Sequence, residues 1–107
     1  MKKTFVATTL ALAATATFAQ AGAPIKIGVV TPLSGTYAGI GQQVKWGLDL
    51  AAAQINASGG VMGRKLELLY EDEEANPAVA TQKAEKLFQV NKVDFLTGTV
   101  NLSLIHI

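Results

Sequence analysis

The sequence predicts a three-layer α/β fold, in which a parallel sheet is built from strands and helices that alternate along the chain. Three short apolar runs with strand character are separated by two segments with helical periodicity, which gives the order β-α-β-α-β. Strands separated by helices run parallel with right-handed crossovers, so the loops after the strands share one edge of the sheet. Open sheets of this kind bind ligands at that edge, where the strand order reverses. We therefore expect loops 32–40 and 98–101 to lie side by side and to form the candidate ligand site.

The first strand covers residues 25–31, and the first helix covers residues 41–56. The segment IKIGVVT is β-branched and mostly apolar, as expected for a strand covered on both faces, and Pro32 ends it. In the helix, apolar residues spaced by three or four positions form one stripe: Val44, Leu48, Ala51, Ala52 and Ile55. The sequence Ser58-Gly59-Gly60 follows, and its glycines supply the positive φ that a helix exit needs.

The second strand covers residues 64–72, the second helix begins at Pro77, and the third strand covers residues 93–97. Apolar and charged residues alternate in RKLELLYED except at Leu69, which indicates a strand less deeply covered than the first. Asn76 fits the N-cap of the second helix, with proline at the first helical position. The stripe of this helix consists of Ala80, Ala84, Leu87 and Phe88.

The composition is that of one small globular domain. The chain has 107 residues, of which 50% are hydrophobic and 16% are charged. Its net charge of +1 includes Lys2 and Lys3, and removing them leaves seven basic residues against eight acidic ones. No basic surface remains to suggest binding to nucleic acid or to an anionic membrane.

Residues 1–21 are typical of a secretory signal peptide. A positive start (MKK) precedes a short, apolar, alanine-rich stretch, and Ala19-Gln20-Ala21 fits a cleavage site before Gly22. An ordinary N-terminal helix is the alternative. The chain has no cysteine, so we expect neither a disulfide nor a lipid-bearing cysteine after the signal. These features favour a periplasmic protein without a membrane anchor.

The glycine-rich loop TPLSGTYAGIG does not fit a nucleotide site. In the dinucleotide fingerprint a glycine or alanine would stand at Val44, and the loop has about nine residues where that fingerprint uses a tight turn. The loop offers hydroxyl groups on Ser34, Thr36 and Tyr37, and exposed N–H groups near a helix start, where negative charge is favoured, on Gly35, Gly39 and Gly41. It therefore suits a small polar ligand with a carboxylate, and a plain surface loop remains the alternative.

No residues suggest catalysis, a metal or a cofactor. The acidic run at residues 71–74 could hold a metal, but it has no histidine or cysteine nearby, and we expect a solvated loop in which Asp72 is a structural acceptor. His106 is the only histidine and cannot by itself build a zinc site or a nucleophile pair. Trp46 lies off the helical stripe, and we expect it to pack against a neighbouring loop rather than to line the cleft or an interface.

Several spaced motifs together resemble a known family. They are P-L-S-G-x-Y-A-x-x-G after the first strand, A-x-x-x-I-N-x-x-G-G-V-x-G-R-K-L-E-L, N-P, K-A-x-K-L and V-x-F-L-x-G. Over residues 25–101 the chain resembles the start of periplasmic substrate-binding proteins of the branched-chain amino acid type, which are leucine-binding-protein-like and serve ABC importers. The resemblance implies the first part of lobe 1 of a type I periplasmic-binding fold, with the second lobe absent.

The resemblance also implies a function and a set of site residues. Such proteins capture an amino acid or a similar small carboxylate or amide, close around it by a hinge, and deliver it to the membrane subunits of the importer without chemistry on the ligand. A monomer is expected, and a ligand-sensing receptor module of the same fold is the alternative. The implied ligand-binding residues are Ser34, Tyr37, Ala38, Gly39, Ile40, Thr99, Val100 and Asn101. Leu102 occupies a position where the family commonly has a serine.

Residues 102–107, LSLIHI, depart from the family pattern. One coding of this segment, CTG TCT CTT ATA CAC ATC, matches the end of a transposase adapter used in library preparation. We therefore expect this segment not to belong to the natural protein, and residues 22–101 to be part of a longer chain. A genuine apolar terminus is the alternative. A fragment of roughly 86 residues after the signal lies near the lower size limit for independent folding, and we expect it not to bind ligand alone.

Overall fold

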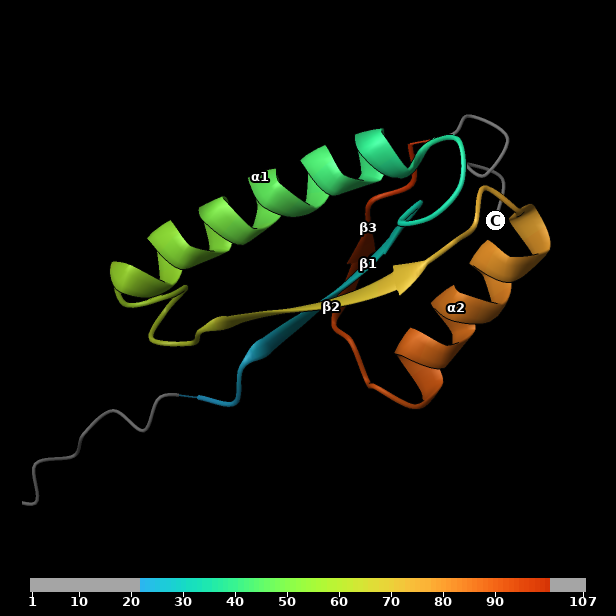
Figure 1. Ribbon diagram of the computed structural model, residues 1–107. Coiled ribbons are helices and arrows are strands. Elements are labelled where there is room, and N and C mark those ends of the chain that lie inside the picture. The colour runs from blue at the N-terminus through green and yellow to red at the C-terminus, as the bar shows by residue number, and fades with distance from the viewer. Residues whose placement is uncertain (1–21, 101–107) are drawn as a thin grey trace, which may run out of the picture.

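The computed structural model describes residues 22–100, which form three strands and two helices (Figure 1). In chain order the elements are β1 Ile25–Thr31, α1 Ala38–Ala57, β2 Leu66–Asp72, α2 Pro77–Gln89 and β3 Phe95–Thr97. The predicted order β-α-β-α-β is therefore confirmed. The expected signal peptide and the segment LSLIHI lie outside the described residues.

The sheet is parallel, and its strand order is β2-β1-β3. The chain passes from β2 over β1 to reach β3, so β1 is the central strand. Figure 1 shows α1 on one side of the sheet and α2 on the other, which makes three layers. The hydroxyl of Tyr70 on β2 donates to Asp49 of α1 over 2.6 Å, whereas Leu69 packs against the buried side chains of α2. Neighbouring residues of β2 thus face opposite helices, as a period of two requires.

The core lies between the sheet and α2. It consists of buried side chains from β1, from α2 and from the segment before β3: Val30, Ala80, Ala84, Leu87 and Val93. Leu87 is 1% exposed and packs over Gly28. A Cβ added to Gly28 would lie 2.9 Å from a methyl carbon of Leu87. The glycine in β1 therefore allows α2 to lie close to the sheet. The predicted stripe of α2 is confirmed at its first three positions and wrong at Phe88, which is 47% exposed.

The stripe of α1 is buried less than predicted. Ala52 is buried and Val44 and Leu48 are half-buried, but Ala51 is exposed and Ile55 is 37% exposed. A helix of 20 residues is roughly 30 Å long, whereas a strand of seven residues is roughly 23 Å long, so α1 extends past the end of the sheet (Figure 1).

Trp46 on α1 is mostly exposed, whereas the sequence predicted that it packs against a neighbouring loop. Its exposed fraction is 64%, and the prediction for it was wrong.

Local signals at the helix ends behave as predicted. The carboxamide oxygen of Asn76 accepts from the backbone N–H of Ala78 over 2.9 Å and from that of Val79 over 3.4 Å, which caps α2. The chain leaves α1 through Gly59 and Gly60, which both have positive φ. Element bounds differ by a few residues, because α1 already begins at Ala38 and the second and third strands begin two residues later than predicted.

Replacement of Leu87 by alanine should destabilise the chain strongly. Leu87 fills the space above Gly28, and its loss leaves a cavity in a small core. We expect Leu87→Ala to lower the free energy of unfolding by about 2–5 kcal/mol in urea titrations followed by circular dichroism. Val90→Ala, at a residue that is 70% exposed, is the matched control and should change it by less than about 0.5 kcal/mol. Equal effects of the two variants would contradict this placement of the core.

Candidate functional site

The carboxyl ends of all three strands lie at one edge of the sheet. In the pairing register Thr31 lies opposite Asp72, and Val29 lies opposite Thr97. The chain after β3 therefore continues beside the end of β1, where the first loop departs (Figure 1). Gly98, with a φ of 108°, lies so close to β1 that an added Cβ would come within 2.7 Å of a Val29 methyl carbon. This edge carries both of the loops that the sequence predicted as the ligand site.

Asp72 fixes the loop that follows β1. One of its carboxylate oxygens accepts from the backbone N–H of Leu33 over 2.9 Å and from that of Glu74 over 2.9 Å. Partial burial acts to raise the pKa of Asp72, but hydrogen bonds from the Ser34 side chain and from the backbone outweigh it, and the pKa lies below its usual range. Asp72 is therefore an ionised acceptor at neutral pH, which confirms the structural role predicted for it.

Gly41 fixes the start of α1 against the same loop. An added Cβ at Gly41 would lie 1.6 Å from the backbone oxygen of Pro32, so no other residue fits there. The N–H of Gly41 donates to the backbone oxygen of Tyr37 over 3.1 Å and is not free for a ligand, contrary to the prediction. The loop itself is residues 32–37, and it is shorter than the nine residues predicted because α1 begins earlier.

The structure places the predicted ligand residues in two groups at this edge. Ser34 and Tyr37 belong to the first loop, and the segment 38–40 forms the first turn of α1 instead of a loop. Thr99 and Val100 follow β3 and are exposed. Six of these residues are exposed and Ala38 is half-buried, whereas Asn101 lies outside the described residues.

The first turn of α1 faces this edge and has no acidic side chain in it. A helix N-terminus carries a partial positive charge, so this turn favours an anionic group such as a carboxylate.

Glu73 is a buried carboxyl group that the sequence did not predict. Its exposed fraction is 0%, and neither of its carboxylate oxygens has a hydrogen-bond partner among the described residues. Burial raises the pKa of Glu73, and the neighbouring charge of Asp72 raises it further. The expectation of a solvated acidic loop is therefore wrong at this residue. The alternation that turns Leu69 and Glu71 toward α2 continues to Glu73 and could have indicated its burial.

The other acidic residues do not form a metal site. Glu71 pairs with Lys83 over 3.4 Å and with Lys86, and these two ion pairs lower its pKa. Within residues 22–100 no group of histidine, cysteine or acidic side chains is arranged to hold a metal ion. In the same part of the chain, neither helix has the length and hydropathy that crossing a membrane requires.

Comparison with known proteins identifies relatives over the described residues. The family model described as periplasmic binding protein matches residues 24–104. The chain is 39% identical over 79 residues to Leu/Ile/Val-binding protein homolog 2 of Brucella abortus (strain 2308), covering 74% of this chain and 21% of that protein. It is 37% identical over 98 residues to Leu/Ile/Val-binding protein BraC3 of Rhizobium johnstonii, covering 92% of this chain and 26% of that protein. The chain thus spans about a fifth to a quarter of the length of these relatives.

Solved structures agree with these relatives. The solute binding protein of an ABC transporter from R. palustris, in complex with benzoate, has a TM-score of 0.69 and 35% identity, covering 78% of this chain and 22% of that one. The branched-chain amino acid transporter substrate binding protein LivJ of Streptococcus pneumoniae, in complex with isoleucine, has a TM-score of 0.67 and 33% identity. That match covers 70% of this chain and 22% of the other.

Asp72→Asn should loosen the first loop. The amide can still accept hydrogen bonds, but it loses the charge that strengthens them, and we expect a cost of about 1–2 kcal/mol at neutral pH. Because the native pKa of Asp72 is lowered, its contribution to stability is present above the usual pKa of aspartate and is lost as the pH falls through the native value. Hydrogen exchange should therefore become faster at the amides of Leu33 and Glu74 in the variant. Glu74→Gln, which removes an exposed charge two residues away, should leave both rates unchanged.

Glu73→Gln should stabilise the chain at neutral pH. The native pKa of Glu73 is raised, so its favourable contribution is present below the usual glutamate pKa near 4.3 and is lost as the pH rises through the native value. Glutamine keeps the shape and carries no charge. The difference in unfolding free energy between variant and wild type should be small near pH 4 and should grow as the pH approaches 7. The exposed Glu67→Gln serves as the control, and a pH-independent difference for Glu73→Gln would disprove the assignment.

Proposed function

We propose that this chain, which belongs to the periplasmic binding protein family, is the first part of the solute-binding component of an ABC importer. Its α/β arrangement is that of the start of a type I periplasmic-binding lobe, as the sequence predicted. The parent protein would capture a small carboxylate, by preference a branched-chain amino acid, and deliver it to the membrane subunits. The observation that supports this most strongly is the pair of exposed loops at the carboxyl edge of a sheet with this family's topology.

The chemistry of the edge supports an anionic ligand. The start of α1 offers the positive end of a helix without a competing acidic residue in its first turn. Thr99 offers an exposed hydroxyl group from the neighbouring loop, close to the end of β1. The relatives are named for leucine, isoleucine and valine, and two similar solved structures contain isoleucine and benzoate. All of these compounds bear a carboxylate. The side-chain pocket that would select among such ligands belongs to the second lobe.

Capture would work by closure of two lobes and without chemistry on the ligand. The described residues contribute only part of one lobe, and the chain spans about a fifth of the first relative. Export by a signal at residues 1–21 would place the parent protein in the periplasm, and no cysteine follows the signal in this chain to carry a lipid anchor. The parent protein would act as a monomer. We infer that residues 22–107 alone do not bind ligand, because they would contribute only one side of a cleft between two lobes.

The proposal is tested with the parent protein expressed from its genomic locus. We expect calorimetry with leucine, isoleucine, valine and benzoate to detect binding of at least one compound to the parent protein and of none to residues 22–107. Tight binding to the shorter chain would refute the inference about the missing lobe. No binding of any small carboxylate to the parent protein would refute the proposed function.

Removal of the Thr99 hydroxyl should weaken that binding. A hydrogen bond from a hydroxyl to a charged group contributes about 1.5–3 kcal/mol, so Thr99→Val should raise the dissociation constant roughly 10-fold or more. The matched control is Ser58→Ala at the end of α1, whose hydroxyl donates to the backbone oxygen of Gln54 over 3.1 Å and lies toward the opposite edge of the sheet, before β2 begins. If both variants bind like the wild type, Thr99 does not contact the ligand.

A further inference from the structure

The turn G-G-V-x-G-R, which follows α1, has no part in the candidate ligand site. It lies at the amino edge of the sheet, because β1 and β2 are parallel and their first residues, Ile25 and Leu66, are paired. The candidate site lies at the opposite, carboxyl edge. The turn belongs to the motifs by which the sequence resembles its family. Its role therefore depends on what it holds at the amino edge.

The backbone of this turn is held in one conformation. The N–H of Val61 donates to the backbone oxygen of Arg64 over 2.7 Å, and the N–H of Arg64 donates back over 3.0 Å. The two residues between them, Met62 and Gly63, have φ values of 52° and 79°, as in a tight hairpin turn. A Cβ added to Gly60 would lie 2.1 Å from the backbone oxygen of Arg64. The backbone of Arg64 is therefore fixed by two neighbouring segments.

The side chain of Arg64 reaches the first described residues of the chain. Its Nε donates to the backbone oxygen of Ala23 over 2.7 Å, and a charged donor makes this bond stronger than one between neutral groups. A Cβ added to Gly22 would lie 3.0 Å from Cγ of Arg64, so the aliphatic part of this side chain packs against the glycine. Two residues later, the N–H of Ile25 donates to the backbone oxygen of Lys65 over 2.9 Å. The start of the described chain is therefore held to the turn and to the residue before β2.

The residues that Arg64 holds come directly after the predicted cleavage site. The sequence predicts that the signal is removed between Ala21 and Gly22. The peptidase adds water across this peptide bond, which leaves a carboxylate on Ala21 and an ammonium group on Gly22. A groove that binds an extended peptide uses its main-chain groups and its side-chain positions. Gly22 and Ala23 must therefore leave Arg64 before a peptidase can bind the residues on both sides of the bond.

We propose that Arg64 holds the start of the mature chain and protects the bond after Ala21 from the signal peptidase once β1 and β2 have paired, so that removal of the signal precedes folding. Cleavage of a folded protein follows the population of its locally opened form, and the contacts of Arg64 lower that population. The proposal rests on the export signal in the proposed function and does not depend on the ligand.

The experiment follows signal removal from the parent precursor by purified signal peptidase. The peptidase is added either at the moment of dilution from urea or after refolding, and mass spectrometry follows the released mature chain. We expect the refolded precursor to be cleaved more slowly than the newly diluted one. Arg64→Ala should speed cleavage of the refolded precursor roughly 10-fold, because a hydrogen bond from a charged donor is lost, and should not change the rate for the newly diluted chain. Arg64→Gln, which keeps most of the side-chain length without the charge, should give a smaller change in the same direction.

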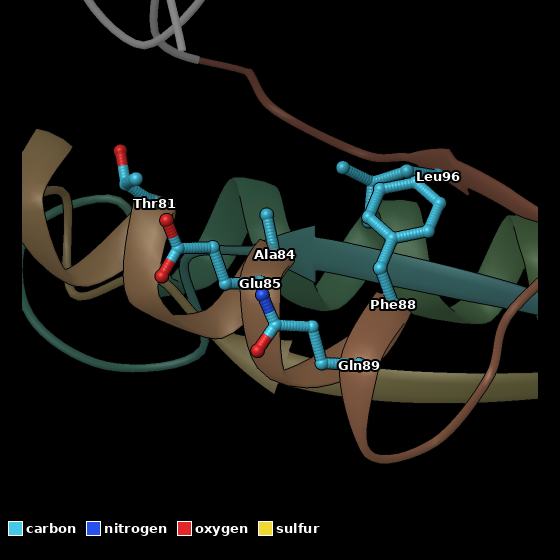
Figure 2. Close-up of a pocket in the computed structure, with 6 residues that line it drawn as sticks. All are labelled: Thr81, Ala84, Glu85, Phe88, Gln89 and Leu96. Carbon is cyan, nitrogen blue, oxygen red and sulfur yellow. The ribbon is translucent and has the colours of Figure 1, made fainter.

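Two controls separate the contact of Arg64 from a change in charge. Lys65→Ala removes an exposed positive charge from the next residue. Glu85→Ala removes an exposed charge on α2, where this residue lines an apolar pocket of about 410 Å³ together with Phe88 and Leu96 (Figure 2). Both variants should be cleaved like the wild type after refolding, and circular dichroism checks that every precursor has refolded.

Each other result would overturn the proposal. Equal rates for the refolded and the newly diluted wild type would show that the fold does not protect the bond. Equal rates for refolded wild type and Arg64→Ala would assign the protection to another part of the fold. No cleavage of either form between Ala21 and Gly22 would show that residues 1–21 are not a signal of this kind. Calorimetry on the parent protein tests the proposed ligand separately, and its result does not depend on these rates.

Discussion

β1 determines the position of every other element, because it is the only described strand that is paired along both edges. Its last four residues are buried, and it has β2 on one side and β3 on the other. A strand in this position must be apolar on both faces, which the segment IKIGVVT satisfies almost throughout. The helices cover its two faces, and the loop at its end becomes part of the candidate site.

Three glycines allow other parts of the chain to approach β1 and the loop after it. Gly28 leaves room for Leu87, Gly98 lies against Val29 and Val30, and Gly41 brings α1 to the backbone of Pro32. Each of these contacts would be blocked by a side chain, so close packing accounts for these three glycines. In the segment after β1, packing accounts for Gly41 and the Asp72 carboxylate holds the backbone, whereas Gly35 has a positive φ and Gly39 has open space around it.

The sequence was sufficient to predict the order of elements, the cap at Asn76 and the core positions of α2, because each depends on local periodicity and hydrogen bonding. It was insufficient for Trp46 and Phe88, because burial of these residues depends on what lies beyond one helix, whereas the burial of Glu73 was missed although the alternation of β2 indicates it. The start of α1 was placed three residues late, since Ala38 and Gly39 are small residues without a capping signal before them. At the candidate site, the sequence identified the two loops and Asp72 as a structural acceptor, but not the amides of Leu33 and Glu74 that donate to it.

Several features of the described residues break the usual rules of packing. Glu73 is buried without a partner, Phe88 is half exposed beside a pocket, and β3 is unpaired along one edge. The alternation of β2 turns Glu73 toward the face that α2 and Phe88 occupy, whereas the contact of Tyr70 with α1 is complete. Local rules are broken in natural proteins where function or further structure compensates for them. The exposed apolar residues of α2 and β3 agree with a chain that spans about a fifth of the length of its first relative.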